Sequence, residues 1–250
     1  MHALIHSITQ LLNSLFGGPL TSLLTAIGIH PENPGAPIAD VLTLELIAAA
    51  GLLLFFIIVR MTLNVEKPNP AQSIAEMINE FVGSQGEAII GHGYEPHVPL
   101  TTMLFLFILL CNCWGLLPGI ETPTAKPFVP LGLALITFVY YNWHGVRAQG
   151  PVGYFKHFLG PVWWISPLMF PVEIISHLAR NMSLTVRLYA NMLASDLLTL
   201  VFFSILPLVL PIVFLGLHFG VAMIQSYVWM LLAFIYLAEA TAHHEEEALG

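Results

Sequence analysis

The sequence is short of charged side chains. Of its 250 residues, 7 are Lys or Arg and 15 are Asp or Glu, which is 9% of the chain, whereas a soluble domain carries about 25%. So few charges cannot cover a surface that faces water, and the mean hydropathy is +0.81. The scarcity of charge therefore excludes an ordinary soluble domain and indicates a chain that lies mostly in lipid.

Basic residues and cysteines are also scarce. Seven scattered basic residues and a net charge of −8 argue against nucleic-acid binding, which needs clustered Lys and Arg. Two cysteines, Cys111 and Cys113, cannot form a disulfide scaffold. No ligand spacing typical of a metal site occurs in the apolar runs. We therefore expect no nucleic-acid partner, no metal and no cofactor.

Long apolar runs fill most of the chain, and they are typical of membrane helices rather than of short alternating barrel strands. We predict an all-α membrane protein with about five transmembrane helices. Pro207 and Pro211 are expected to turn the last run into a helical hairpin. Its first helix is too long to stand upright in the bilayer and must tilt. The predicted spans are 41–60, 99–118, 128–146, 166–206 and 208–239.

Two segments differ from these spans. Apolar residues from Ile74 to Val82 recur at helical spacing with glutamates on the other side, which predicts an amphipathic surface helix over about 70–90. Residues 1–39 are mildly apolar and interrupted by Gly and Pro, which indicates an interfacial segment and a linker. Residues 40–250 are then a single membrane domain.

The few basic residues predict the orientation. If the spans alternate, Arg60, Lys67, Arg147 and Lys156 fall on one side of the membrane, and Lys126 falls alone on the other. The side richer in Lys and Arg is the cytoplasmic one. We therefore expect the N-terminus outside and the C-terminus in the cytoplasm.

The predicted span 166–206 is unusual because it is rich in polar residues. A charged side chain in a membrane helix costs about 2.5–3.5 kcal/mol or more near its centre. At 100° per residue, most of this polar set forms one stripe about 80° wide, while Asp196 lies about 180° from Arg187. The set is Glu173, Ser176, His177, Arg180, Arg187, Asn191, Ser195 and Asp196.

The last predicted span offers partners for this set. His218 and Gln225 share a face of an otherwise apolar run, and the hairpin places Asp196 at the depth of His218. Asp and His can both gain and lose a proton, whereas Arg187 cannot release its own and acts as a fixed positive charge. These residue types in this arrangement favour proton movement.

Several of these residues also have a structural interpretation. Arg180 and Glu173 can lie at the membrane interface, with Arg180 extending its head group to water. His177 can be a packing residue, and Asp196 with His218 can form a static buried pair. The tail from His243 to Glu247 is expected to be solvated.

The run from Glu173 to Leu197, with Ser183-Leu184 followed by Arg187, Asn191 and Asp196, resembles subunit a of the F-type ATP synthases. The resemblance covers roughly residues 40–240. In the family, Asp196 is usually Glu, and this shorter side chain is expected to reach His218 through a water. A proline also often follows the equivalent of Arg180, where this chain has Asn181.

The resemblance implies a proton-translocating stator subunit that provides two half-channels to the carboxylates of the rotor c-ring. It implies an integral, multi-pass protein of a bacterial plasma membrane, with peripheral-stalk b subunits and the lipid bilayer as further partners, and no catalysis by the chain itself. The implied proton-translocating residues are Arg187, Asn191, Asp196, His218 and Gln225. The implied cytoplasmic half-channel residues are Glu173, Ser176, His177 and Arg180.

Two other classes of protein are alternatives to this interpretation. A secondary transporter could use Arg187 to bind an anionic substrate, but such proteins often carry inverted repeats and broken helices, and neither is apparent in the sequence. An intramembrane metalloenzyme would need ligand clusters within the spans, and His177 and His218 have no Cys or His at ligand spacing.

Overall fold

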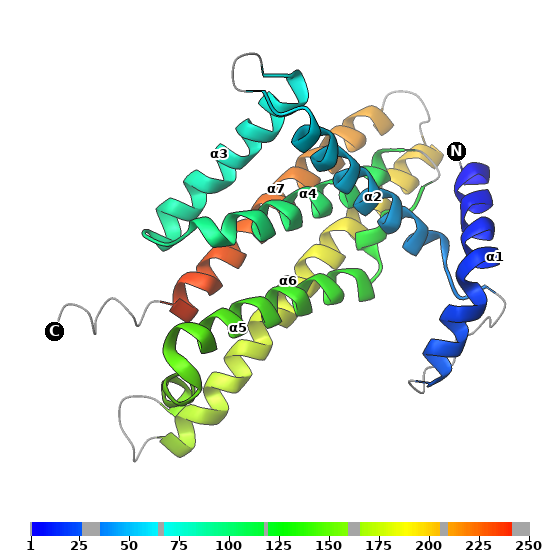
Figure 1. The fold of residues 1–250 in the computed structure, drawn as a ribbon. Coiled ribbons are helices and arrows are strands. Elements are labelled where there is room, and N and C mark those ends of the chain that lie inside the picture. Colours follow the sequence, from blue (N-terminus) through cyan, green and yellow to red (C-terminus); the bar gives the residue numbers. More distant parts are fainter. Residues whose placement is uncertain are drawn as a thin grey trace.

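The chain folds as a bundle of α-helices (Figure 1). The computed structural model describes residues 2–26, 36–64, 68–117, 120–159, 166–205 and 210–241. Within these ranges there are helices and no strand, which confirms the all-α prediction. The α-helices are α1 (His2–Ala26), α2 (Asp40–Met61), α3 (Pro70–Ile90), α4 (Val98–Cys113), α5 (Phe128–Leu159), α6 (Ser166–Ile205) and α7 (Leu210–Thr241). Single 3₁₀ turns are η1 (Glu95–His97), η2 (Trp114–Leu116) and η3 (Pro123–Ala125).

Four of the described segments are long and apolar enough to cross a membrane, and they match four of the five predicted spans. The fifth predicted span, 128–146, is helical within α5, but its mean hydropathy is too low for it to be one of these four segments. The reason is the polar and aromatic run from Tyr140 to His144. A crossing by α5 stays a prediction. The four segments are Asp40–Met61, Glu95–Leu116, Leu168–Ile205 and Ile212–Thr241.

Helix α3 has the two faces expected of a surface helix, and it is not among the four described segments that could span. Val82 is fully buried against α4 and α7, whereas Met77 is 64% exposed. Pro70 occupies its first turn, where a missing N–H has no consequence. Gly91, with φ of +79°, ends the helix in a conformation that favours glycine.

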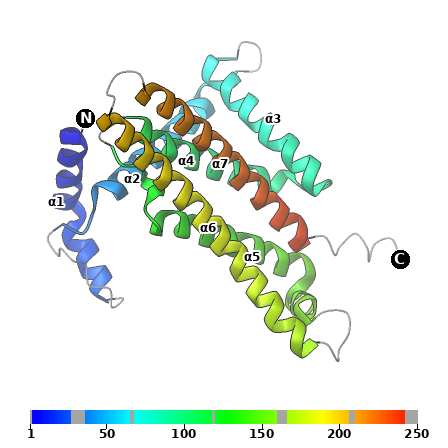
Figure 2. The same cartoon turned by 180° about the vertical axis from the view of Figure 1, so that it is seen from behind.

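Helices α6 and α7 form an antiparallel hairpin, and they lie side by side in both views (Figure 2). Their polar contacts show the direction. Asp196 contacts His218, Asn191 contacts Gln225, and Arg180 contacts Glu239. Residues earlier in α6 therefore contact residues later in α7, as in an antiparallel pair. The predicted turn at Pro207 lies outside the described residues.

Helix α6 has one packed face and one bare face. Leu184, Leu188 and Met192 are buried where α4, α5, α6 and α7 meet. On the other side Met182 and Val186 are 60% and 54% exposed. The bare face is apolar, as expected of a surface that meets lipid or another membrane protein.

The N-terminal segment is a single helix, α1, that continues through Pro19. It contacts α2 through polar groups: the Thr9 and Thr43 hydroxyls lie 2.9 Å apart. Asn13 both donates to the Ile38 carbonyl and accepts from the Ile38 N–H, each at 2.9 Å. Much of the expected linker and the tail His243–Glu247 lie outside the described residues.

Candidate functional site

The angle of each polar residue around α6 decides whether its side chain faces a neighbouring helix or the bare face. His177 and Ser195, at one edge of the predicted stripe, face neighbouring helices. Arg187, at the other edge, lies on the bare face. Asn191, near the middle of the stripe, is exposed yet reaches α7. The stripe therefore follows the boundary between the packed and bare faces.

The first group lies between α4, α6 and α7, with all members buried except Asp196, which is half-buried. It is called here the buried cluster: Asn112, Thr122, Ser195, Asp196 and His218. The His218 side chain is 1% exposed. Its Nδ1 lies 2.8 Å from Ser195 Oγ and 3.5 Å from Asp196 Oδ1. Its Nε2 lies 3.0 Å from the Asn112 carbonyl oxygen. Both ring nitrogens are thus engaged.

Asp196 is held mainly by Thr122, which belongs to the loop before η3. The Thr122 hydroxyl donates to Asp196 Oδ1 at 2.8 Å, and the Thr122 N–H donates to Oδ2 at 3.3 Å. The 3.5 Å to His218 is within ion-pair range but long for a hydrogen bond. The direct bond to His218 therefore comes from Ser195, and the Asp196 carboxylate stands beside it.

Asn191 and Gln225 form the next step along the hairpin. The Asn191 amide donates to Gln225 Oε1 at 3.0 Å. The Gln225 side chain is buried, and its Nε2 has no hydrogen-bond partner among the described residues. A buried amide with a spare donor is suited to hold a water or an incoming polar group.

Arg187 is an exposed charge on an apolar face. No described residue forms a hydrogen bond or an ion pair with it. Ser183, Ala190 and Ala194 lie on the same side of the helix at spacings of three to seven residues. These small side chains leave the guanidinium accessible to a neighbouring helix.

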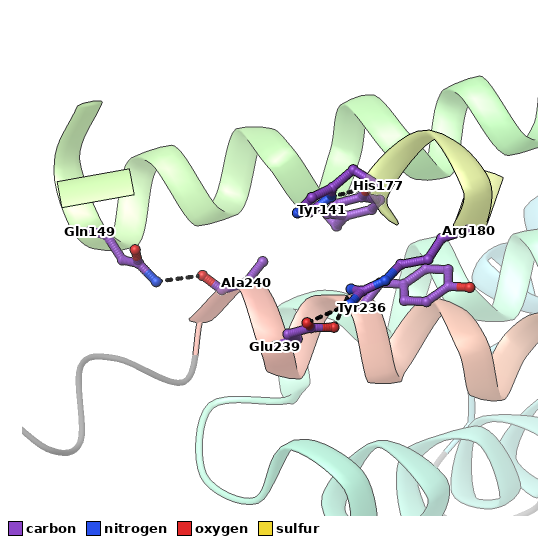
Figure 3. A pocket seen from close by; sticks show the side chains of 7 residues that line it. All are labelled: Tyr141, Gln149, His177, Arg180, Tyr236, Glu239 and Ala240. Atoms are coloured by element: carbon purple, nitrogen blue, oxygen red, sulfur yellow. Dashed lines mark hydrogen bonds and ion pairs between the residues drawn. The ribbon is translucent and has the colours of Figure 1, made fainter. Parts of the chain in front are cut away.

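The second group lines a pocket at the other end of the hairpin, called here the end pocket (Figure 3). Arg180 forms a bidentate ion pair with Glu239, with Nη2 at 2.8 Å from Oε1. His177 Nδ1 lies 3.1 Å from the Tyr141 hydroxyl. The pocket is lined by Tyr141, Gln149, His177, Arg180, Tyr236, Glu239 and Ala240.

The other two residues predicted for this end lie next to the end pocket. Glu173 Oε1 is 3.6 Å from His177 Nε2, one helical turn away, and Ser176 is half-buried on α6. Neither lines the pocket. His177 therefore stands between Glu173 on its own helix and Tyr141 on α5. Among the described residues, no group of three or more His, Cys, Asp or Glu side chains could hold a metal ion.

Sequence reasoning missed four partners of these residues: Thr122, Tyr141, Glu239 and the Asn112 carbonyl. Glu239 could have been found by extending the hairpin register that pairs residue 196 with 218. Thr122 lies in a loop, and the Asn112 contact uses the main chain, so neither has a periodic signal in the sequence.

The sequence is similar to those of known proteins. The sequence profile described as ATP synthase A chain matches residues 42–238. ATP synthase subunit a of Koribacter versatilis is 52% identical over 94% of this chain and 96% of its own length. The subunit a of Solibacter usitatus is 40% identical over 92% and 98%, and that of Sulfurimonas denitrificans is 38% identical over 80% and 90%.

The match spans α3 to α6 and all but the outer ends of α2 and α7, so it includes the buried cluster, Arg187 and most residues of the end pocket. It agrees with the family resemblance seen in the run from Glu173 to Leu197. The chain therefore belongs to the ATP synthase subunit a family, as an integral membrane protein of the ATP synthase membrane sector.

Proposed function

We propose that this chain is the proton-conducting stator of its ATP synthase and that it gives two half-channels access to the rotor c-ring. The observation that carries the proposal is Arg187, a permanent charge on the bare apolar face without a partner among the described residues. A charge left in lipid costs about 2.5–3.5 kcal/mol or more. A carboxylate on the rotor, passing the bare face of α6, would supply the missing counter-charge.

The outer half-channel runs through the buried cluster and the pair Asn191–Gln225. Asp196 and His218 are the groups in this path that can take up and release a proton. Asn191 and Gln225 lie between them and Arg187 along α6 and α7. A proton passing this way reaches the rotor carboxylate on one side of Arg187. The fixed charge opposes a proton that would pass straight through.

The cytoplasmic half-channel begins at the end pocket. His177 is one of the titratable groups that line it, with Glu173 one helical turn away and the Tyr141 hydroxyl 3.1 Å from its Nδ1. Ser176 and Arg180 lie on the same stretch of α6. The ion pair between Arg180 and Glu239 joins α6 to α7 at this end, so a proton leaving the rotor passes a fixed, polar exit.

The setting follows from the same proposal. The chain spans a bacterial plasma membrane with its N-terminus outside, and peripheral-stalk b subunits hold it in place. It performs no catalysis by itself; ATP is made by other subunits, and this chain supplies the proton path. Its polar residues serve the path because they lie along one hairpin next to Arg187, the charge on the bare face of α6.

Arg187→Ala tests the proposal. The substitution removes the only proposed partner of the rotor carboxylate, so ATP-driven proton pumping into inverted membrane vesicles should be abolished. Arg60→Ala is the matched control, because Arg60 is an exposed arginine at the end of α2, and this variant should pump normally. Normal pumping by Arg187→Ala would contradict the proposal. Purification with a small hydrophobic ring protein supports it, whereas stabilisation by an anionic solute alone supports a transporter.

A further inference from the structure

His218 is held on both sides of its ring at a fully buried position. Its side chain is 1% exposed. On one side Nε2 lies 3.0 Å from the main-chain carbonyl oxygen of Asn112. On the other side Nδ1 lies 2.8 Å from Ser195 Oγ and 3.5 Å from Asp196 Oδ1. Nε2 therefore faces a carbonyl oxygen, whereas Nδ1 faces a hydroxyl and a carboxylate.

The Asn112 carbonyl decides where the ring proton lies. A carbonyl oxygen can only accept a hydrogen bond, so Nε2 must carry a hydrogen at 3.0 Å from it. In a neutral imidazole the other nitrogen is then unprotonated and accepts. The Ser195 hydroxyl can donate to it, and the ring keeps this tautomer as long as the carbonyl contact persists.

Gly115 makes this contact possible because it has no side chain. A Cβ added at Gly115 would lie 2.8 Å from His218 Nε2 and 2.7 Å from its Cε1. It would lie closer still to the Thr122 hydroxyl, the group that holds Asp196. One absent methyl group thus leaves room for both the His218 ring and the Thr122 side chain.

We propose that the Asn112 carbonyl, with Gly115 beside it, fixes the tautomer of His218, so that Nδ1 is the atom that takes up and releases the transported proton. A protonated Asp196 gives its proton to Nδ1 through a bridging water, because the 3.5 Å between Oδ1 and Nδ1 is long for a direct transfer. Asp196 becomes a carboxylate, the imidazole becomes an imidazolium, and the Ser195 hydroxyl changes from donor to acceptor at Nδ1. The imidazolium then releases a proton from Nδ1 to a water on the side of Gln225 and returns to the neutral ring, while Nε2 keeps its own hydrogen. Thr122 and Asn112 are positioning residues that act through Asp196 and His218.

The inference deepens the outer half-channel of the proposed function and rests on it, but the tautomer can be read without measuring transport. Nitrogen chemical shifts of isotope-labelled histidine in the assembled complex distinguish the two neutral tautomers. His218→Gln identifies the signal by its disappearance. We expect a neutral ring protonated at Nε2 that gains its second proton at Nδ1. A neutral ring protonated at Nδ1 would overturn the inference.

Gly115→Ala tests the steric part of the inference. The added methyl group should displace His218 and Thr122 and lower passive proton flux through the membrane sector at least about tenfold, in the range for loss of a proton-transfer group. Gly132→Ala is the matched control, since no atom lies within 4 Å of its added Cβ, and its flux should equal that of wild type. Equal flux in the Gly115→Ala and Gly132→Ala variants would count against the inference.

Thr122 supplies a second pair of variants in case Gly115→Ala does not assemble. Thr122→Ser keeps the hydroxyl that donates to Asp196 and should conduct like wild type. Thr122→Val keeps the shape, loses the donor, and should conduct at least about tenfold less. Wild-type flux in Thr122→Val would oppose the positioning role. If Arg187→Ala pumps normally while His218 shows the Nε2–H form, the proposed function fails on its own and the tautomer assignment stands.

Discussion

Asp196 and Arg187 lie nine residues apart on α6 and meet opposite surroundings. Asp196 is partly buried and accepts two hydrogen bonds from Thr122, with His218 nearby. Arg187 is exposed and has no such partner among the described residues. Nine residues correspond to about two and a half turns, which puts the two side chains on opposite sides of the helix, so one charge faces the bundle and the other faces outward. Each position suits its proposed role, one exchanging protons and one meeting the rotor.

Asp196→Asn tests the proton-exchange role at the residue scale. The amide keeps nearly the same volume and can still accept from Thr122, but it cannot take up and release a proton at accessible pH. Passive proton flux through the membrane sector should fall at least about tenfold, while the amount of assembled complex should stay near that of wild type.

Glu121→Gln is the control for this prediction. It makes the same chemical change on a neighbouring loop residue whose side chain is 70% exposed and paired with Lys126. Its flux should match wild type. A flux unchanged in Asp196→Asn, or lowered equally by Glu121→Gln, would remove Asp196 from the proposed path.

At the scale of elements, the Arg180–Glu239 ion pair joins the N-terminal half of α6 to the end of α7. The two side chains are 30% and 43% exposed, and the Arg180 guanidinium also lies 5.8 Å from the centre of the Tyr236 ring. An exposed ion pair is worth about 0.2–1 kcal/mol. The pair is therefore expected to set the position of the two helix ends more than to hold the fold together.

A double-mutant cycle measures the interaction energy between Arg180 and Glu239. Arg180→Ala and Glu239→Ala should each lower the thermal stability of the purified complex by a small amount. The double variant should be less destabilised than the two changes added together, by about 0.2–1 kcal/mol. Thermal unfolding in detergent is the measurement. Strict additivity of the two changes would show that the pair is not coupled in the assembled protein.

The hairpin shows which parts of the site the sequence could predict. Helical periodicity predicts the polar stripe on α6, and the proline break predicts that α7 runs antiparallel to it. Together they predict that Asp196 lies near His218. The roles of Thr122 and the Asn112 carbonyl depend on how a loop and a main-chain group pack across the bundle. Periodicity carries no information about such contacts, and only the folded chain brings them together.

At the scale of the whole molecule, the predicted crossing by α5 determines on which side of the membrane the loops before and after it lie. Tyr140 to His144 make the second half of the predicted span 128–146 more polar than the other spans. Aromatic residues of this kind are typical of a membrane interface. Their place in the sequence therefore agrees with a crossing by α5 that ends near Tyr140, with the rest of α5 beyond the lipid.

Labelling of single cysteines tests this topology. Cysteine at Glu121, before α5, should react with a membrane-impermeant maleimide added to intact cells. Cysteine at Arg147, after the crossing, should react only once the membranes are opened. Both positions are exposed. The unsubstituted chain is the control, since Cys111 is buried and Cys113 is half-buried. Labelling of both positions from the same side would mean that α5 does not cross.

The antiparallel contacts of α6 and α7 also have a mechanical consequence. They occur at three heights, at residues 180, 191 and 195–196 of α6. In the proposed function, a rotor that turns past α6 would apply a sideways force to one arm of the hairpin. Sliding α6 along α7 would load all three contacts in shear at the same moment, whereas peeling would break them one after another. The hairpin is thus stiffest against displacement along its own axis, and its stiffness, like its proposed proton path, depends on the polar contacts between α6 and α7.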